Sequence, residues 1–300
     1  MKIKDSPSRI VFKVINTILM CLLAFACIIP LWHVLMASFS NPTLITQHSG
    51  LIFWPLSGPG RSATLGGYKI VLKTASLARG YANTIFYVGV GTILCVSFCS
   101  IAAYCISRRR TLWMKYLLLI IMLTMFFNGG LIPTYMVNKY LTLVNKRWVM
   151  IIMGLMPVFF IIIIRTAFMQ LPASLEESAQ LDGAGHMTIL IKIILPLSKA
   201  TIAVIALFYA VAKWNEYLFA VIYLTNRKLY PLQVLLREIL VESSGNLDFN
   251  IANEVGGGGE DYKKLLQYTT IIYATLPILA VYPFVQKYFV TGVMIGSIKG

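Results

Sequence analysis

The chain has 300 residues, of which 58% are apolar and only 12% are charged, and its mean hydropathy is +0.76. A soluble domain cannot bury that much apolar surface, so the composition predicts a polytopic membrane protein. The net charge of +15 does not indicate a nucleic-acid-binding protein, because the basic residues form small clusters at the ends of apolar stretches. Such clusters are how membrane proteins hold their topology.

Five stretches carry no Asp, Glu, Lys or Arg: residues 14–60, 80–107, 116–138, 148–164 and 265–286. Most can hold the ~20 apolar residues that cross a ~30 Å hydrocarbon core, and 148–164 does so with its flanks. We therefore expect an all-α integral membrane protein with six transmembrane helices. The predicted spans are roughly 11–38, 82–107, 113–137, 148–170, 193–224 and 268–290.

The first residues indicate the orientation of the chain. Residues 1–13 carry four basic residues, and the connection between the second and third spans carries Arg108, Arg109, Arg110 and Lys115. Dense, short basic segments favour the cytoplasm. The apolar run after residue 13 is too long for a signal-peptide core, so we expect an uncleaved first span. Residues 1–13 are then a cytoplasmic N-terminus, residues 14–300 a single transmembrane domain, and both termini are cytoplasmic.

Two longer segments, roughly 39–81 and 225–267, fall on the opposite side of the membrane. The second holds six of the eleven acidic residues and the run Gly256–Gly259. That run is not a phosphate loop, because no Gly-Lys-Ser/Thr follows it, and we expect a flexible hinge. Residues 231–242 have apolar residues at helical spacing, which predicts a surface helix. All five cysteines lie in predicted spans, where we expect them to pack as small apolar residues.

Residues 171–196, which we call the elbow, connect the fourth and fifth spans. Ser174 and Glu177 have the spacing of a capping box, and Gly183 can provide the turn that ends the first short helix. A second apolar helix then leads back to the bilayer, and Pro196 marks its entry. A plain connection between two spans would explain these features as well as a docking site for another protein.

The spacing of the elbow decides between these readings. Glu177-Ser178-Ala179, two residues, Asp182-Gly183-Ala184, eight residues and Ile193-x-Leu195-Pro196 resemble the EAA loop of permease subunits in ATP-driven importers. Nearly the whole chain resembles the MalG-type carbohydrate ABC-transporter permeases, most closely the branch for complex polysaccharides or uronate-containing oligosaccharides. The segments that carry this resemblance are 83–92, 124–135, 214–224 and 276–300.

The resemblance implies a type I ABC-importer fold with a cytoplasmic coupling loop on which a separate ATPase docks. It implies that Glu177 pairs with a basic residue of the ATPase. The other residues assigned to coupling are Ala179, Asp182, Gly183, Ala184, Ile193 and Pro196. A second permease, two ATPase subunits and an extracytoplasmic solute-binding protein complete the implied assembly, with ATP and Mg²⁺ bound by the ATPase subunits and no cofactor on this chain.

A charged pair, Lys213 and Glu216, lies inside the fifth predicted span. The two residues are three apart on a helix and can neutralise each other. Ionisable groups at that depth face protein or a water-filled cavity. They form either a structural ion pair or, with Trp214, Asn215 and Tyr217, part of a sugar pathway.

No paired carboxylates, metal-ligand cluster or nucleophile constellation stands out, so an enzyme is disfavoured. The sequence has no phosphate loop, and we do not expect the chain to hydrolyse ATP. A stand-alone secondary transporter is the competing function, but it predicts an internal repeat and leaves the elbow unexplained. The sequence does not name the sugar.

Overall fold

The computed structural model describes residues 6–58, 63–107, 113–127, 129–241 and 260–297, which form helices joined by short connections. Three of these helices are long and apolar enough to cross a membrane, and the number rises to six if each sharply bent helix pair is one span. The predicted all-α membrane fold agrees with this count. By their internal contacts, residues 1–78 and 236–276 form one compact unit, and residues 79–235 and 277–300 form another.

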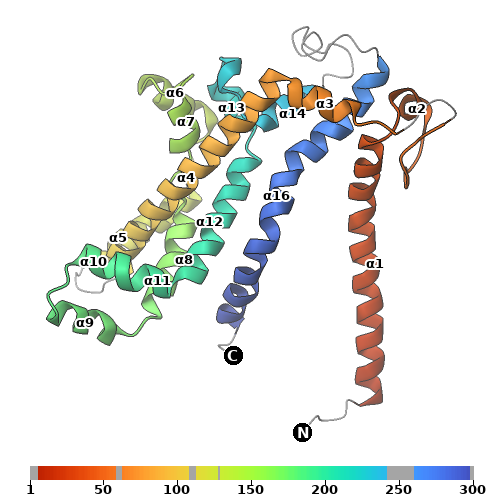
Figure 1. Ribbon diagram of the computed structural model, residues 1–300. Coiled ribbons are helices and arrows are strands. Elements are labelled where there is room, and N and C mark those ends of the chain that lie inside the picture. The colour runs from red at the N-terminus through yellow and green to blue at the C-terminus, as the bar shows by residue number, and fades with distance from the viewer. Residues whose placement is uncertain (1–5, 59–62, 108–112, 128, 242–259, 298–300) are drawn as a thin grey trace. The chain divides into compact units, whose positions relative to one another are not determined.

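The first unit contains α1 (Pro7–Ser38), α2 (Pro42–Gln47), α3 (Gly66–Lys73) and the first part of α16 (Glu260–Ser297) (Figure 1). His33 of α1 packs edge-on against Tyr268 of α16, with ring centroids 5.5 Å apart. The Nδ1 atom of His33 accepts a hydrogen bond from the N–H of Ile52 at 2.9 Å. This histidine therefore fixes both the end of α1 and the chain that follows it.

A second contact in this unit joins α1 to α3. The hydroxyl groups of Ser38 and Tyr68 are 2.7 Å apart, and the Tyr68 ring packs on Phe39. Burial raises the pKa of the Tyr68 phenol, so this group acts as a neutral hydrogen-bonding partner. Tyr68 of α3 and Phe39 therefore pack together beside the end of α1.

The second unit is built on α4 (Ala75–Ser107), which is continuous over 33 residues. Figure 1 shows the elbow helices at one end of α4, and α7 and α13 at the other. Helices α5 and α12 both pack on α8. The other helices of this unit are α5 (Met114–Phe126), α6 (Leu131–Tyr140), α7 (Arg147–Ile152), α8 (Val158–Met169), α12 (Lys199–Trp214), α13 (Leu218–Tyr223), η2 (Arg227–Leu229) and residues 232–235 of α14 (Leu232–Val241).

Three predicted spans differ from the observed helices. The segment 113–137 is divided between α5 and α6, and 148–170 is interrupted between α7 and α8, where Gly154 has a φ of +68° and Pro157 precedes α8. The segment 193–224 contains the end of the elbow, α12 and α13. Glycine in the left-handed region and proline both end a helix, so apolar length alone overestimated its continuity.

The predicted helix after residue 231 is present as α14, and several of its apolar residues are buried: Leu232, Val234, Leu235 and Ile239. Cysteines follow the prediction only in part, since Cys95 and Cys99 are fully buried but Cys21, Cys27 and Cys105 are exposed on the apolar helices α1 and α4. The basic run Arg108–Arg110 and the predicted hinge Gly256–Gly259 lie outside the described residues.

Close packing of α4 on α14 depends on Gly80. A Cβ atom at this position would lie 2.6 Å from Cδ1 of Leu235 and 3.5 Å from the backbone of Leu232. We expect Gly80→Val to lower the free energy of unfolding by about 1–3 kcal/mol, because overpacking forces the two helices apart.

The matched control is Gly89→Val on the same helix, where a Cβ would have no atom within 4 Å. Denaturant unfolding in mixed micelles measures both variants. Equal losses of stability in the two variants would contradict the role of Gly80.

Candidate functional site

The elbow begins with a short helix that differs from the predicted capping box. Helix α9 spans Ala173–Leu181, its N-cap is Pro172, and no side chain caps it. Ser174 therefore lies within the first turn, and the box with Glu177 is not formed. The helix starts two residues earlier than a Ser174 cap would place it, because the ring of Pro172 fixes φ at −58° and its extended backbone (ψ of 133°) directly precedes Ala173.

The turn after α9 follows the predicted role of Gly183. Gly183 has a φ of +82°, and its N–H donates to the carbonyl of Gln180 at 3.0 Å. The N–H of Ala184 donates to the carbonyl of Ala179 at 2.9 Å. This pair of hydrogen bonds is the Schellman arrangement that ends a helix when glycine takes the left-handed conformation. Asp182 is the exposed C-cap residue beside it.

The second helix of the elbow runs from His186 to Leu197, as α10 (His186–Ile189), the π-helical segment η1 (Leu190–Ile194) and α11 (Leu195–Leu197). In η1 the N–H of Leu195 bonds to the carbonyl of Leu190, five residues earlier. Proline clashes with the carbonyl four residues before it in an α-helix, and this wider turn accommodates Pro196.

Pro196 does not mark the change of direction. The helix His186–Leu197 meets α12 at an angle of 85°, and the break lies at Ser198. Pro196 is exposed inside the elbow helix, while Ile193 is half-buried against the core of the unit. The change of direction therefore lies two residues after Pro196, because the π-helical turn accommodates the proline without bending the chain there.

The two adjacent carboxylates of α9 point in different directions. Glu176 is buried, and its Oε1 accepts a hydrogen bond from the hydroxyl of Tyr104 at 2.9 Å. Glu177 is exposed, and so are Ser178 and Asp182. Ala179, three residues after Glu176, is buried in the same core as Tyr104. One face of α9 is therefore fixed inside the protein, and the other presents an acidic surface.

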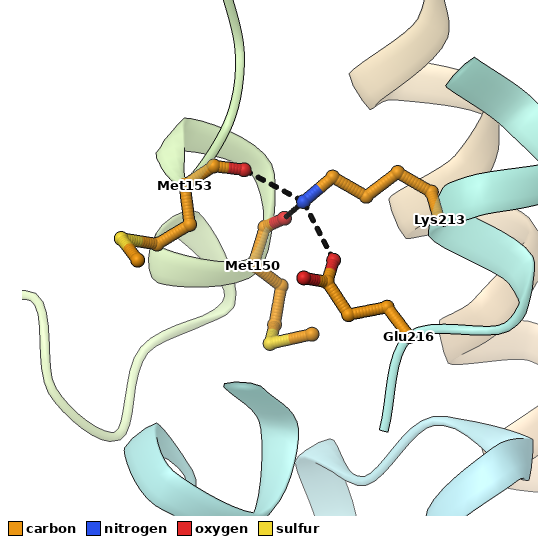
Figure 2. A network of polar contacts seen from close by, with 4 residues as sticks. All are labelled: Met150, Met153, Lys213 and Glu216. Carbon is orange, nitrogen blue, oxygen red and sulfur yellow. Dashed lines mark hydrogen bonds and ion pairs between the residues drawn. The ribbon is translucent and has the colours of Figure 1, made fainter. Parts of the chain in front are cut away.

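The buried ammonium group of Lys213, in the fifth predicted span, binds the carboxyl-terminal end of α7 (Figure 2). The Nζ of Lys213 donates to Oε2 of Glu216 at 2.7 Å and to the carbonyl oxygens of Met150 and Met153 at 2.9 and 2.7 Å. These carbonyls belong to the last turn of α7 and to its C-cap, where intrahelical donors run out. The side chain of Lys213 is only 6% exposed, so the ion pair satisfies backbone groups that water does not reach.

The residues around this pair form a break between α12 and α13. Trp214 is buried and packs edge-on against Tyr81, with ring centroids 5.9 Å apart. Asn215 is exposed, and its Nδ2 donates to the carbonyl of Val211 at 3.0 Å. Tyr217 is half-buried and packs on the core around α7 and α13. Of the four predicted pathway residues, Asn215 is the one that is exposed.

Comparisons with known proteins identify the family of the chain. Residues 111–295 match the family described as the binding-protein-dependent transport system inner membrane component. The chain belongs to this family. It is the permease subunit of an ABC importer, and the stand-alone secondary transporter is excluded.

Individual relatives cover almost the whole permease. It is 36% identical over 277 residues to the polygalacturonan/rhamnogalacturonan transport system permease protein YtcP of Bacillus subtilis, covering 92% of this chain and 94% of the relative. Protein LplC of the same organism is 36% identical, with 97% and 95% covered. A chain from the crystal structure of a bacterial ABC transporter involved in the import of the acidic polysaccharide alginate is 30% identical, with a TM-score of 0.86 and 96% and 100% covered.

Sequence reasoning missed two residues of the elbow region in this permease, Glu176 and Tyr104. Glu176 has no position in the elbow motif, although its spacing of three from Ala179 places both on one helix face. Tyr104 had no signal in the sequence, because it is 72 residues away from Glu176. In the part of the chain that the structure describes, no group of three or more His, Cys, Asp or Glu side chains could hold a metal ion.

Removing the Lys213 ammonium is expected to destabilise the permease strongly. Lys213→Met leaves the Glu216 carboxylate and the carbonyls of Met150 and Met153 without their donor, and breaking a buried pair from one side costs about 3–5 kcal/mol. The free energy of unfolding in mixed micelles measures this loss.

The double variant Lys213→Met/Glu216→Gln is the control, because it also removes the unpaired charge. It is expected to recover part of the lost stability. A loss below about 1 kcal/mol in the single variant would show that the ion pair does not hold α7 in place.

Proposed function

We propose that this permease forms one half of the channel of an importer that carries uronate-containing oligosaccharides into the cytoplasm. Its similarity to a polygalacturonan/rhamnogalacturonan permease protein and to a transporter for an acidic polysaccharide supports this class of substrate. Other relatives are named for the transport of neutral sugars, among them an arabinooligosaccharide permease protein that is 26% identical. The greater similarity to the first two favours acidic sugars.

The proposed assembly contains a second permease, two ATPase subunits and an extracytoplasmic solute-binding protein. The name of the family supports the binding protein. The described residues contain one elbow and at most six spans. A channel that docks two ATPase subunits needs two elbows, so we assign the second elbow to a second permease. ATP and Mg²⁺ are assigned to the ATPase subunits, because the sequence has no phosphate loop.

The elbow is the proposed docking site for an ATPase subunit. The exposed carboxylate of Glu177 carries this proposal, because it lies on the open face of a helix whose other face is anchored in the core. Asp182, Gly183 and Ala184 shape the turn beside it, while Ala179 and Ile193 hold the two helices of the elbow on the core. Exposed Pro196 lies on the second helix.

The orientation follows from this docking site. With the elbow in the cytoplasm, both termini are cytoplasmic, and residues 39–81 and 225–267 face the binding protein. ATP-driven closure of the ATPase subunits then moves the elbow, and the two permeases rock against each other to open the channel alternately on each side.

Reversing the charge of Glu177 tests the docking site. We expect Glu177→Lys to insert into the membrane normally but to repel the basic residue assigned to the ATPase, so that uptake falls by about tenfold or more. Copurification of the ATPase with tagged permease, and transport in proteoliposomes, measure the two effects.

The matched control is Thr188→Lys, an exposed position on α10 that carries no proposed docking contact. If the Glu177→Lys permease retains its ATPase and transports as well as the wild type, the elbow does not dock the ATPase through Glu177.

The helix break at 214–217 is the proposed sugar-contacting segment, with Asn215 as its exposed member. An amide can hydrogen-bond sugar hydroxyls, and half-buried Tyr217 provides aromatic surface two residues away, while Trp214 is buried against Tyr81. Glu216 supports this segment through its ion pair with Lys213.

The test measures how ATPase activity depends on the concentration of galacturonate trisaccharide presented with the binding protein. We expect Asn215→Leu to raise the trisaccharide concentration for half-maximal stimulation by about fivefold or more. Loss of one hydrogen-bonding partner in a sugar site has this size. An unchanged concentration dependence would exclude a contact between Asn215 and the sugar.

A further inference from the structure

Tyr104 lies where α4 meets both helices of the elbow. Its hydroxyl donates to Oε1 of Glu176 on α9 at 2.9 Å and lies 3.5 Å from Nδ1 of His186 on α10. Tyr104 is 6% exposed and Glu176 is 8% exposed. One phenol at the end of α4 therefore contacts the first residue of the second elbow helix and a buried carboxylate of the first.

The hydrogen bond between Tyr104 and Glu176 is the strong contact of this group. It is the shorter of the two printed contacts of the Tyr104 hydroxyl, and a buried carboxyl group needs a hydrogen-bonding partner to offset its lost hydration. The Nε2 of Gln180 lies 3.5 Å from the same oxygen and adds a weaker contact within α9. Movement of α9 away from α4 would leave the Glu176 carboxylate without the Tyr104 donor.

The far end of the same helix is held by a second set of side-chain bonds. The Nδ2 of Asn83 donates to the carbonyls of Lys228 and Tyr230 at 2.8 and 3.1 Å, and the Tyr87 hydroxyl donates to the carbonyl of Leu229 at 2.9 Å. Thr84 adds a bond from the N–H of Leu232 to its Oγ1 at 2.8 Å. The connection between α13 and α14 is thus tied to the first turns of α4.

Between these two ends α4 is one unbroken helix. Asn83 and Tyr104 are 21 residues apart, which is about 30 Å at 1.5 Å per residue. A continuous helix transmits displacement along its length, whereas α7 and α8, or α12 and α13, are separated by breaks that can absorb it.

We propose that Tyr104 and Glu176 are positioning residues that couple movement of the elbow to α4, and through α4 to the connection at residues 226–232. The proposal rests on the docking function of the elbow. The two adjacent carboxylates then have different roles. Glu177 faces the ATPase, and Glu176 transmits the movement into the membrane domain.

The test uses the complete transporter in proteoliposomes, with galacturonate trisaccharide as the transported probe. Tyr104→Phe removes one hydroxyl and keeps the ring. We expect this variant and Glu176→Ala to keep the ATPase bound and hydrolysing ATP, while the number of sugars imported per ATP falls by about fivefold or more, the range typical of coupling between sites.

Two further variants separate coupling from stability. Glu176→Gln keeps an acceptor for the phenol and is expected to lose less than Glu176→Ala. The double variant Tyr104→Phe/Glu176→Ala is expected to lose no more than Glu176→Ala alone, because both changes remove the same bond. Tyr140→Phe is the matched control, since that tyrosine is 88% exposed.

An unchanged ratio of sugar to ATP in both single variants would overturn the proposal, and so would release of the ATPase by Tyr104→Phe or an equal loss in Tyr140→Phe. The proposed docking function fails separately, if Glu177→Lys keeps both its ATPase and its transport. A normal Tyr104→Phe permease beside a defective Glu177→Lys permease would reject the coupling role alone.

Discussion

Buried backbone groups at interrupted helices are the constraint on which the second unit depends. Its predicted spans are broken at several points, and each break leaves carbonyl or N–H groups that lipid cannot satisfy. At the end of α7 the Lys213 ammonium takes two of these carbonyls, while Glu216 balances its charge. A pair that insertion energies alone would disfavour is therefore a support for irregular backbone in an apolar setting.

The permease contains a long continuous helix, α4, and several short helices separated by breaks. Helix α4 has no break and is held by side-chain bonds near both of its ends. Its neighbours α7, α8, α12 and α13 are short, and their junctions contain glycine, proline or polar residues. A transporter that alternates between two states needs both kinds of element: continuous helices that carry displacement and junctions at which short segments reorient.

The first helix of the elbow has one face that packs on the core and one face that is exposed. The Schellman turn at Gly183 sets the angle between its helices, and Ala179 buries α9 against the core. Glu176 and Glu177 are neighbours in sequence, but the helix separates them by about 100° (3.6 residues per turn), and so one is buried while the other is exposed.

The sequence by itself determined the membrane class, the helical fold, the permease family and the turn at Gly183, because apolar length, charge placement and glycine conformation are local properties. It also identified Lys213 and Glu216 as a pair, since they are one helical turn apart. Only the tertiary structure decided that Lys213 holds the end of α7 and that Glu176 meets Tyr104. These contacts join residues 60 or more positions apart or involve backbone carbonyls, which every residue carries and which no sequence pattern marks.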